Sequence, residues 1–256
     1  MLAIVTAPAR AQEEVPFITT PDAVTLEMLR AADVKASDFV LDLGSGDGRI
    51  VITAARRFGA RGLGIEIVPD LVRRSRDNAR LAGVSDRAEF REQDLFKTDL
   101  AQATVITLYL LPEVNLQLRP AILALKPGTR IVSHDWDMAD WRPDRTTVLD
   151  VPEKTIGREK KSRVHLWIVP APVGGAWCGE GSLEDSHLTL EQRFQSVRGT
   201  LRAGRQFRTL EGVIVGDRLR ATAQDASANP AMEYRFANDV LHVVGGRRAT
   251  DSFRRC

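Results

Sequence analysis

The feature that most constrains the fold is a glycine-rich stretch that follows directly on a short apolar run. The residues FVL at 39–41 lead into DLGSGDGR at 42–49, where three glycines alternate over five positions. Glycines permit a tight turn from a strand into a helix and let the backbone approach a ligand closely. A helical pattern of apolar residues follows at 50–58. The stretch therefore predicts a strand, a ligand-binding turn and a helix, with an ordinary tight turn as the alternative.

Strand and helix patterns alternate beyond this turn. Apolar strands are expected at 39–43, 62–66, 88–93, 105–109 and 130–133, helices at 69–83 and 112–125, and two last strands at 146–151 and 164–169. Segments of these lengths in alternation are typical of a doubly wound sheet with helices on both faces. The predicted fold class is therefore α/β, with a seven-stranded Rossmann-like sheet.

The pattern changes near residue 170. The segment PAPVGG at 170–175 is typical of a linker, and helical periodicity does not return after it. Short alternating segments separated by glycine-containing turns predict a small antiparallel β domain at 176–256, with the arginine-rich end as a solvated tail. We therefore divide the chain into a leader (1–14), an α/β domain (15–169), a linker and a β domain that docks an acceptor or stabilises the protein.

The spacing of the glycines separates this turn from a dinucleotide site. It is G-x-G-x-G rather than G-x-G-x-x-G, and Asp42 and Asp47 would repel a pyrophosphate. S-adenosylmethionine carries an ammonium and a sulfonium group, which suit a loop flanked by carboxylates. We therefore expect this cofactor to bind the loop through Asp42, Gly44, Ser45, Gly46 and Gly48.

Polar residues at the ends of the later strands extend the expected site, because ligands bind at the carboxyl ends of the strands in such sheets. Glu66 is suited to accept hydrogen bonds from both hydroxyls of a ribose, or is a solvated acid. Asp94 suits the adenine amino group, with Leu95 against the ring, or caps a helix. Tyr109 and Pro112 follow the fourth strand, toward which the transferable methyl should point.

These motifs resemble the class I S-adenosylmethionine-dependent methyltransferases. The resemblance is closest to the protein-lysine methyltransferases of the ATP synthase c-subunit and the adenine nucleotide translocase, and to their bacterial relatives. It rests on VPF at 15–17, the block at 42–55, QDLFK at 93–97 and the run at 111–118, and covers roughly residues 15–145. It implies that Asp42, Gly44, Gly46 and Glu66 hold the cofactor, that Asp94 lies at the adenine, and that residues 16–20 form a lid.

Two features depart from that family. The segment HDWDMADW at 134–141 stands where the family has a Phe/Pro-rich stretch. The mitochondrial members also carry an N-terminal membrane segment, whereas no apolar run here approaches the roughly 18 residues that span a bilayer. Both departures bear on the acceptor more than on the cofactor.

Methyl transfer to a lysine needs a positioned, neutral amine. Tyr109 and Asp135 are the candidate catalytic residues, since either can orient the amine or pass its proton to water. His134 is a structural, hydrogen-bonded histidine or a general base. Aromatic faces attract alkylated ammonium groups, although the two tryptophans among the candidates also suit plain packing. The expected lining of the acceptor channel is Phe17, Thr20, Pro112, Trp136 and Trp141.

Composition limits the classes of binding partner to be expected. A formal net charge of +2 argues against a strongly electrostatic nucleic-acid binder, although the arginine-rich end leaves weak contact with a polyanion open. With two cysteines, neither a disulfide framework nor a cysteine-rich metal site is available, and the four histidines share no metal-ligand spacing, so no metal is expected. The predicted function is methyl transfer from S-adenosylmethionine to a protein lysine, with a membrane protein among the candidate acceptors. A small-molecule or lipid acceptor, and a non-catalytic cofactor-binding module, stay open as alternatives, as does the oligomeric state.

The start of the chain leaves the compartment open. A short apolar patch at 2–5 precedes Ala9-Arg10-Ala11, which resembles the cleavage site of a secretory signal, but a positively charged region ahead of it is missing. The alternatives are a signal remnant on an exported protein and a disordered leader on a cytoplasmic one. The cytoplasmic supply of S-adenosylmethionine favours the second.

Overall fold

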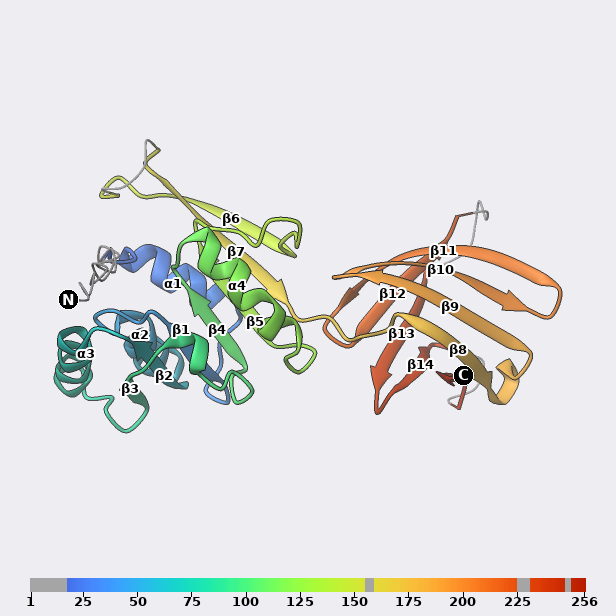
Figure 1. The fold of residues 1–256 in the computed structure, drawn as a ribbon, viewed down its shortest axis with the longest axis horizontal. Helices are drawn as coiled ribbons and strands as arrows, with labels where there is room; N and C mark the ends of the chain where they lie inside the picture. The colour runs from blue at the N-terminus through green and yellow to red at the C-terminus, as the bar shows by residue number, and fades with distance from the viewer. Residues whose placement is uncertain (1–17, 155–158, 225–230, 247–249) are drawn as a thin grey trace, which may run out of the picture.

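A computed structural model describes residues 18–154, 159–224, 231–246 and 250–256. Figure 1 shows a sheet with helices on both faces, joined by one connection to a barrel of strands. Among the described residues no helix is both long and apolar enough to cross a membrane. The expectations for the leader, for Ala9-Arg10-Ala11 and for Phe17 concern residues outside those described.

The predicted seven-stranded sheet is confirmed, in the order β3-β2-β1-β4-β5-β7-β6. Strands β1 to β5 run parallel, and β7 lies antiparallel between β5 and β6. The strands are β1 (Phe39–Leu43), β2 (Arg61–Glu66), β3 (Ala88–Glu92), β4 (Val105–Leu108), β5 (Arg130–His134), β6 (Arg145–Asp150) and β7 (Lys161–Ile168). The helices are α1 (Asp22–Ala31), α2 (Arg49–Phe58), α3 (Pro69–Leu81) and α4 (Pro112–Leu123), with a 3-10 turn, η1 (Leu95–Lys97).

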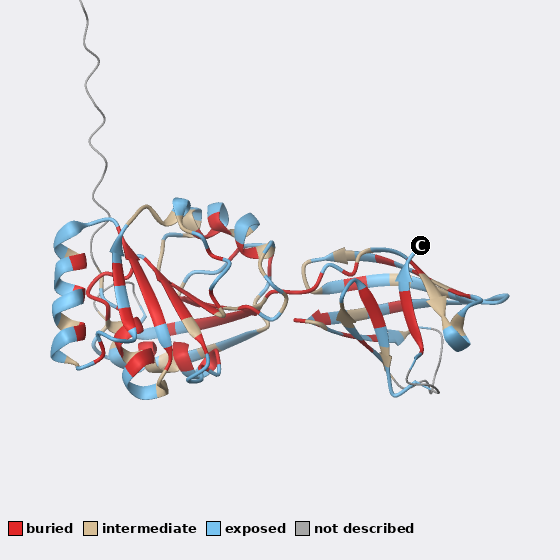
Figure 2. Ribbon diagram, turned by 90° about the horizontal axis from the view of Figure 1, so that it is seen from below, coloured by how far each residue is buried: buried red, intermediate tan, exposed pale blue. Residues whose placement is uncertain are grey.

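Both faces of the central strands β1, β4 and β5 are buried, which explains their continuous apolar sequences (Figure 2). Successive residues of a strand point to opposite faces, so Val40 packs with α1 and the start of α2, whereas Leu41 packs with α4. Helix α2 ends at Gly59, whose positive φ of 70° forms a left-handed cap. A third cluster, beneath α2 and α3, covers the face of β3 that carries Ala88 and Phe90. Layers on both sides therefore hold the carboxyl ends of β1 to β4 together.

The predicted β-rich C-terminal part is also confirmed, and its strands form a closed barrel, β10-β11-β12-β13-β14-β15-β8-β9. The strands are β8 (Gly175–Glu180), β9 (Ser186–Arg193), β10 (Ser196–Ala203), β11 (Gln206–Val215), β12 (Arg218–Ala223), β13 (Met232–Ala237), β14 (Val240–Val244) and β15 (Ser252–Arg255), with a 3-10 turn, η2 (Gly181–Leu183). Closure leaves no open sheet edge along this meander. Apolar side chains that include Trp177, Tyr234 and Phe253 fill the interior.

One expectation for the end of the chain is wrong. The arginine-rich end is no solvated tail, because β15 pairs with both β14 and β8 and completes the barrel. The two cysteines also pair, since Cys178 on β8 forms a disulfide with Cys256, 78 residues further along. Counting cysteines missed this bridge because one disulfide needs only two residues that the fold brings together.

The segment predicted to be a linker is packed against the barrel. Ala171 and Val173 are fully buried in the barrel core. Gln192 on β9 holds both ends of the segment: its side-chain oxygen accepts hydrogen bonds from the amides of Val173 and Gly174, and its amide group donates to the carbonyl of Ala171. The connection is therefore fixed, although the domain boundaries themselves stay predictions.

One turn of the barrel contacts the sheet domain. Phe194, between β9 and β10, has a positive φ of 54° and stacks on Trp141 with ring centroids 5.9 Å apart. On α4, the Arg119 guanidinium lies 5.4 Å from the centre of the same ring. Asp140 accepts hydrogen bonds from Arg119 and from Arg193, which flanks Phe194. An aromatic contact surrounded by charges therefore joins the barrel to the loop that follows β5.

Candidate functional site

The glycine-rich turn lies where the sequence predicts it, between β1 and α2. Gly44, Gly46 and Gly48 all have positive φ, of 78°, 54° and 83°. A Cβ at Gly44 would lie 2.9 Å from Leu110, and one at Gly48 would lie 2.6 Å from the Phe90 ring. Side chains are excluded at both positions by conformation and by space. The turn therefore presents bare backbone at the carboxyl end of β1.

Glu66, at the end of β2, holds this turn. One carboxylate oxygen accepts a hydrogen bond from the Gly46 amide at 2.9 Å, and the other accepts from the amides of Ile67 and Val68. The side chain is 8% exposed, so it is no solvated surface acid. Each oxygen can accept more than one hydrogen bond. The prediction that Glu66 also binds ribose hydroxyls stays open.

Asp42 places a carboxyl group beneath the turn. Thr107 donates a hydrogen bond to it at 2.7 Å, and the residue is 2% exposed. Burial, together with the nearby carboxylates of Glu66 and Asp47, raises the pKa of Asp42 to about 7, although the Thr107 hydrogen bond opposes the rise. Acidic groups crowded in this way are stabilised by a cation, so the residues present fit the ammonium and sulfonium of S-adenosylmethionine.

Arg49, the first residue of α2, ties the turn to the chain ahead of α1. Its guanidinium donates to both carboxylate oxygens of Asp47, and it also donates to the Thr20 carbonyl at 2.8 Å. Burial opposes ionisation of Asp47, but the hydrogen bonds from Arg49 prevail and lower the pKa of Asp47. Sequence reasoning missed Arg49; the available signal was a cation at a helix N-terminus, where the dipole disfavours it.

Asp94 caps η1, with one carboxylate oxygen accepting from the Phe96 amide at 2.9 Å. Leu95 packs against the core cluster under α4. The helix-capping interpretation of Asp94 therefore holds in this structure, while its contact with adenine stays a prediction. Since the cap fixes the chain after β3, it positions Leu95 at the same edge of the sheet as Glu66.

Tyr109 and His134 stack at the ends of β4 and β5, with ring centroids 4.0 Å apart. The His134 Nε2 atom lies 2.9 Å from the Ser162 hydroxyl, and Nδ1 lies 3.4 Å from that of Thr20. Burial lowers the pKa of His134 to about 4, so the ring is neutral near pH 7. Burial and the charge of Asp135 raise the pKa of Tyr109, so the phenol keeps its proton.

The Asp135 side chain is held by two residues that follow later in the sequence, Lys154 after β6 and Arg163 on β7. Its carboxylate accepts hydrogen bonds from Lys154 Nζ at 2.7 Å and from the Arg163 amide at 2.8 Å. Lys154 also donates to the Lys161 carbonyl. The sequence analysis did not identify Lys154. This residue follows β6 and reaches the site only because β7 and β6 extend the sheet past β5. Two candidate catalytic residues thus lie together, but the carboxylate of Asp135 already has a cationic partner.

A cavity of about 330 Å³ opens beside these residues. It connects the segment ahead of α1, the start of α2 and the ends of β4 and β5. Thr20 borders this segment, whereas Pro112, Trp136 and Trp141 are not among the residues that line the cavity. The lining residues are Ile18, Thr19, Pro21, Asp22, Arg49, Tyr109, His134, Glu153 and Lys154.

The expectation that Trp141 lines an acceptor channel is wrong. Trp141 has no exposed surface, and it packs against Trp167 and Phe194 within the cluster that includes α4. Its role is the plain packing that the sequence left as the alternative. Trp136 is 43% exposed on the same loop and stays a prediction.

Comparison with known proteins agrees with this arrangement. The ANTKMT methyltransferase domain matches residues 42–145. A protein-lysine N-methyltransferase from Saccharolobus islandicus (strain REY15A) is 43% identical over 131 residues, which cover 50% of this chain and 81% of that protein. The lysine N-methyltransferase of the ATP synthase c-subunit from Mus musculus is 39% identical over 109 residues, 42% of this chain and 44% of its own length.

A solved structure is also similar. The crystal structure of an RNA methyltransferase from Salinibacter ruber, in complex with S-adenosyl-L-homocysteine, is 52% identical with a TM-score of 0.55, and the match covers 61% of this chain and 96% of that one. The fold and the site define an S-adenosylmethionine-dependent methyltransferase, which confirms the predicted cofactor and enzyme class. The chain belongs to the family of the protein-lysine N-methyltransferases represented by the Saccharolobus protein.

Proposed function

We propose that this enzyme transfers the methyl group of S-adenosylmethionine to the Nζ atom of a lysine in a protein. The observation that carries this proposal is the 43% identity to a protein-lysine N-methyltransferase, across most of that enzyme's length. A lysine is also the acceptor in the names of two mouse enzymes, the lysine N-methyltransferases of the ATP synthase c-subunit and of the adenine nucleotide translocase, which are 39% and 38% identical. By analogy with those acceptors, the proposed substrate is a membrane protein.

The cofactor's place follows from the chain's own groups. The bare backbone of the glycine turn admits a ligand, the buried carboxyl of Asp42 favours a cation, and Glu66 offers further acceptor capacity beside Gly46. When bound, S-adenosylmethionine supplies an electrophilic methyl group on a positively charged sulfur. The chain need supply no strong acid, because transfer to an amine depends mainly on position and on the neutral state of that amine.

The charges around the cavity suit a lysine. Arg49 is paired with Asp47, and Lys154 is paired with Asp135, so both cations of the lining are neutralised. Glu153 lines the same cavity with an exposed side chain, as does Asp22, whose carboxylate lies 3.8 Å from the Arg49 guanidinium. Their carboxylates attract an incoming ammonium group and repel a phosphate backbone. The local field therefore favours a protein lysine over a nucleic acid.

Tyr109 positions the amine in this proposal. Its phenol lines the cavity and stays protonated, so its oxygen can accept a hydrogen bond from the acceptor nitrogen without becoming charged. The ammonium of the acceptor would lose its proton to water in the cavity. Its freed lone pair would then take the methyl carbon as the carbon–sulfur bond breaks, leaving S-adenosylhomocysteine. Asp135 acts through the Lys154 and Arg163 contacts that fix the loop after β5, as a positioning residue rather than a base.

A second candidate acceptor is RNA, because the 52% identical Salinibacter protein is described as an RNA methyltransferase. Labelled S-adenosylmethionine added to fractionated lysate with the full-length enzyme separates the two. Label in protein that ribonuclease leaves intact, recovered as methyl-lysine after acid hydrolysis, supports the lysine acceptor. Label that ribonuclease releases, or that organic solvent extracts, contradicts it.

Two variants distinguish the acceptor side of the site from the cofactor side. Tyr109→Phe should lower kcat on the protein acceptor and leave the affinity for S-adenosylhomocysteine unchanged, since the phenol contacts the acceptor side of the site. Glu66→Ala should weaken cofactor binding by about 1.5 to 3 kcal/mol, the scale for hydrogen bonds to a charged group. A wild-type enzyme that binds S-adenosylhomocysteine but labels no fraction would instead indicate a non-catalytic binding module.

A further inference from the structure

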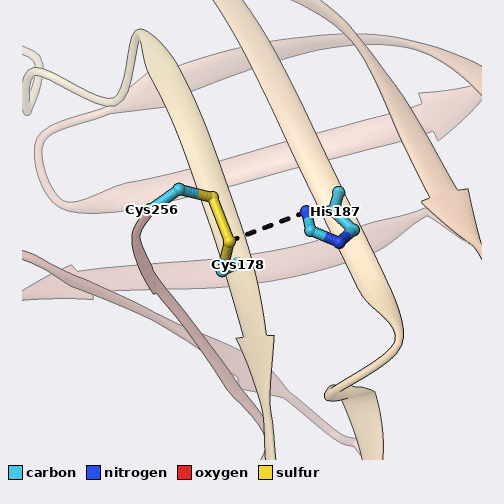
Figure 3. Close-up of a disulfide and its surroundings, with 3 residues drawn as sticks. All are labelled: Cys178, His187 and Cys256. Atoms are coloured by element: carbon cyan, nitrogen blue, oxygen red, sulfur yellow. Dashed lines mark hydrogen bonds between the residues drawn. A yellow bond between two sulfur atoms is a disulfide. The ribbon is translucent and has the colours of Figure 1, made fainter.

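Three metal-ligating side chains converge on the outside of the barrel. Cys178 lies on β8, His187 lies directly opposite it on β9, and Cys256 follows β15. Their ligand atoms all lie within 4.8 Å of one another, and the Cys178 Sγ atom is 3.6 Å from the His187 Nδ1 atom. Figure 3 shows the imidazole facing the disulfide of the two cysteines. None of these residues takes part in the glycine-turn site.

This geometry suits a tetrahedral thiophilic ion. With zinc-to-sulfur bonds of about 2.3 Å and a zinc-to-nitrogen bond of about 2.1 Å, tetrahedral angles place sulfur about 3.6 Å from nitrogen and the two sulfurs about 3.8 Å apart. The observed separation of the Cys178 sulfur from the His187 nitrogen already matches the first of these distances. The two sulfurs must move apart, which reduction of the disulfide permits, and the Cys256 sulfur starts within 4.8 Å of the His187 ring nitrogen.

The scaffold holds the three residues together independently of the disulfide. The Cys256 amide donates to the Ala176 carbonyl at 3.2 Å, which keeps the chain end on β8. Next to it, the Arg255 guanidinium lies 3.9 Å from the centre of the Trp177 ring and donates to the Pro172 carbonyl at 2.7 Å. Reduction therefore leaves both thiols beside the imidazole, so little ordering is needed for a metal to bind.

We propose that the reduced barrel binds one zinc ion through the Cys178 and Cys256 sulfurs and the His187 Nδ1 atom, with water in the fourth position. The disulfide is the metal-free, oxidised state of the same site. A dithiol reductant supplies two electrons and two protons, which convert the disulfide into two thiols while the reductant forms its own disulfide. Zinc then displaces the two thiol protons, and the two thiolates balance its charge.

Cobalt titration of the full-length protein, without an affinity tag, tests this site. After reduction by dithiothreitol and removal of the reductant under argon, Co²⁺ should produce a thiolate-to-cobalt charge-transfer band at one equivalent per chain, and Zn²⁺ should abolish it. The oxidised protein should show no band. Absence of the band from the reduced protein at saturating Co²⁺ would overturn the proposal.

Variants identify the ligands. Cys178→Ser and Cys256→Ser should each lose the band, and His187→Gln should weaken zinc by at least the roughly tenfold that outer-shell partners are worth. The matched control is His242→Gln, an exposed histidine on β14 of the same barrel, which should bind zinc like the wild type. Unchanged zinc affinity in His187→Gln would refute the three-ligand site.

A measurement on the unmodified chain guards against variants that fail to fold. Zinc should slow alkylation of both thiols in the reduced wild-type protein by about tenfold or more, because a bound thiolate is a poorer nucleophile. Equal alkylation rates with and without zinc would contradict metal binding, whatever the variants do.

Discussion

Removal of one aromatic ring should loosen the barrel from the methyltransferase domain. Phe194 is the barrel residue that stacks on Trp141 and lies under the Arg119 guanidinium. Phe194→Ala deletes the ring from both contacts and leaves the barrel core intact, because Phe194 packs on the cluster around Trp141 and not inside the barrel. The contact is non-local, so its loss should weaken docking rather than folding of either part.

The magnitude follows from the partial burial of that ring. Complete burial of an aromatic side chain removes about 150 to 250 Å² from water, and at about 25 cal/mol per Å² half of that area corresponds to roughly 2 to 3 kcal/mol. The cation–π contact with Arg119 adds about 0.5 to 1 kcal/mol. We therefore expect a docking penalty of about 2.5 to 4 kcal/mol, an upper figure because the area scale ignores relaxation.

Hydrogen–deuterium exchange and urea unfolding measure this effect. Exchange should increase both at 193–195 and at 135–141, the loop that carries Trp141 and Asp135, while β1 and β12 stay protected. Phe207→Ala is the matched control, since Phe207 is 64% exposed on β11 and should change stability by less than about 0.5 kcal/mol. Urea unfolding needs two probes, because a protein of two parts can unfold in more than one step.

Enzyme kinetics of Phe194→Ala distinguish a contact that supports activity from one that only covers Trp141. Because the loop at 135–141 begins with Asp135, its loosening should lower kcat on the acceptor and leave S-adenosylhomocysteine affinity within a few-fold of wild type. A Phe194→Ala protein whose stability and exchange equal those of Phe207→Ala would refute the reasoning, and Trp141 would then be held by the sheet domain alone.

Four further outcomes are expected. The affinity for S-adenosylmethionine should rise about tenfold from pH 6 to pH 8, because Asp42, with its pKa raised to about 7, ionises and attracts the cationic ligand, and Asp42→Asn should remove this slope in calorimetry. In the ligand-free enzyme Asp42 binds its proton more tightly in the folded state than in the unfolded state. Its contribution to the free energy of unfolding should therefore decline between about pH 4 and pH 7 and stay constant above pH 7, which urea midpoints measured across that range will test. Gly48→Ala should destabilise the protein by about 1 to 3 kcal/mol, because the position has a positive φ and a Cβ there would clash with the Phe90 ring. The control is Gly204→Ala, which has a positive φ but open space around it and should cost less. Equal losses of stability in thermal unfolding would indicate that backbone strain alone is responsible. Arg49→Met should raise the acceptor KM more than the cofactor Kd by releasing the segment ahead of α1, and parallel changes in both constants would contradict that role.

Local sequence patterns were sufficient to predict the α/β fold and the cofactor-binding turn. The alternation of strands and helices is a short-range signal, because each element must bury an apolar face of its own period. The glycine turn is equally local: positive φ at Gly44, Gly46 and Gly48 is a property of consecutive residues. Glu66 and Asp94 then followed from their places at strand ends, since parallel strands bring those ends to one edge.

Local patterns were insufficient wherever two distant segments meet. Lys154 reaches Asp135 only because β6 and β7 extend the sheet past β5, and no spacing in the chain encodes that contact. Trp141 belongs to the core because Phe194, from a different part of the protein, covers it.

The same limit applies at the end of the chain. Closure of the barrel, which pairs β15 with β8, turned an arginine-rich end into a strand and brought Cys256 to Cys178 and His187. Periodicity and motif spacing report on neighbours in sequence, and so they determined the fold class and the cofactor. The partners of Asp135, Trp141 and Cys256 lie across sheets and between domains, where only tertiary packing decides which side chains meet.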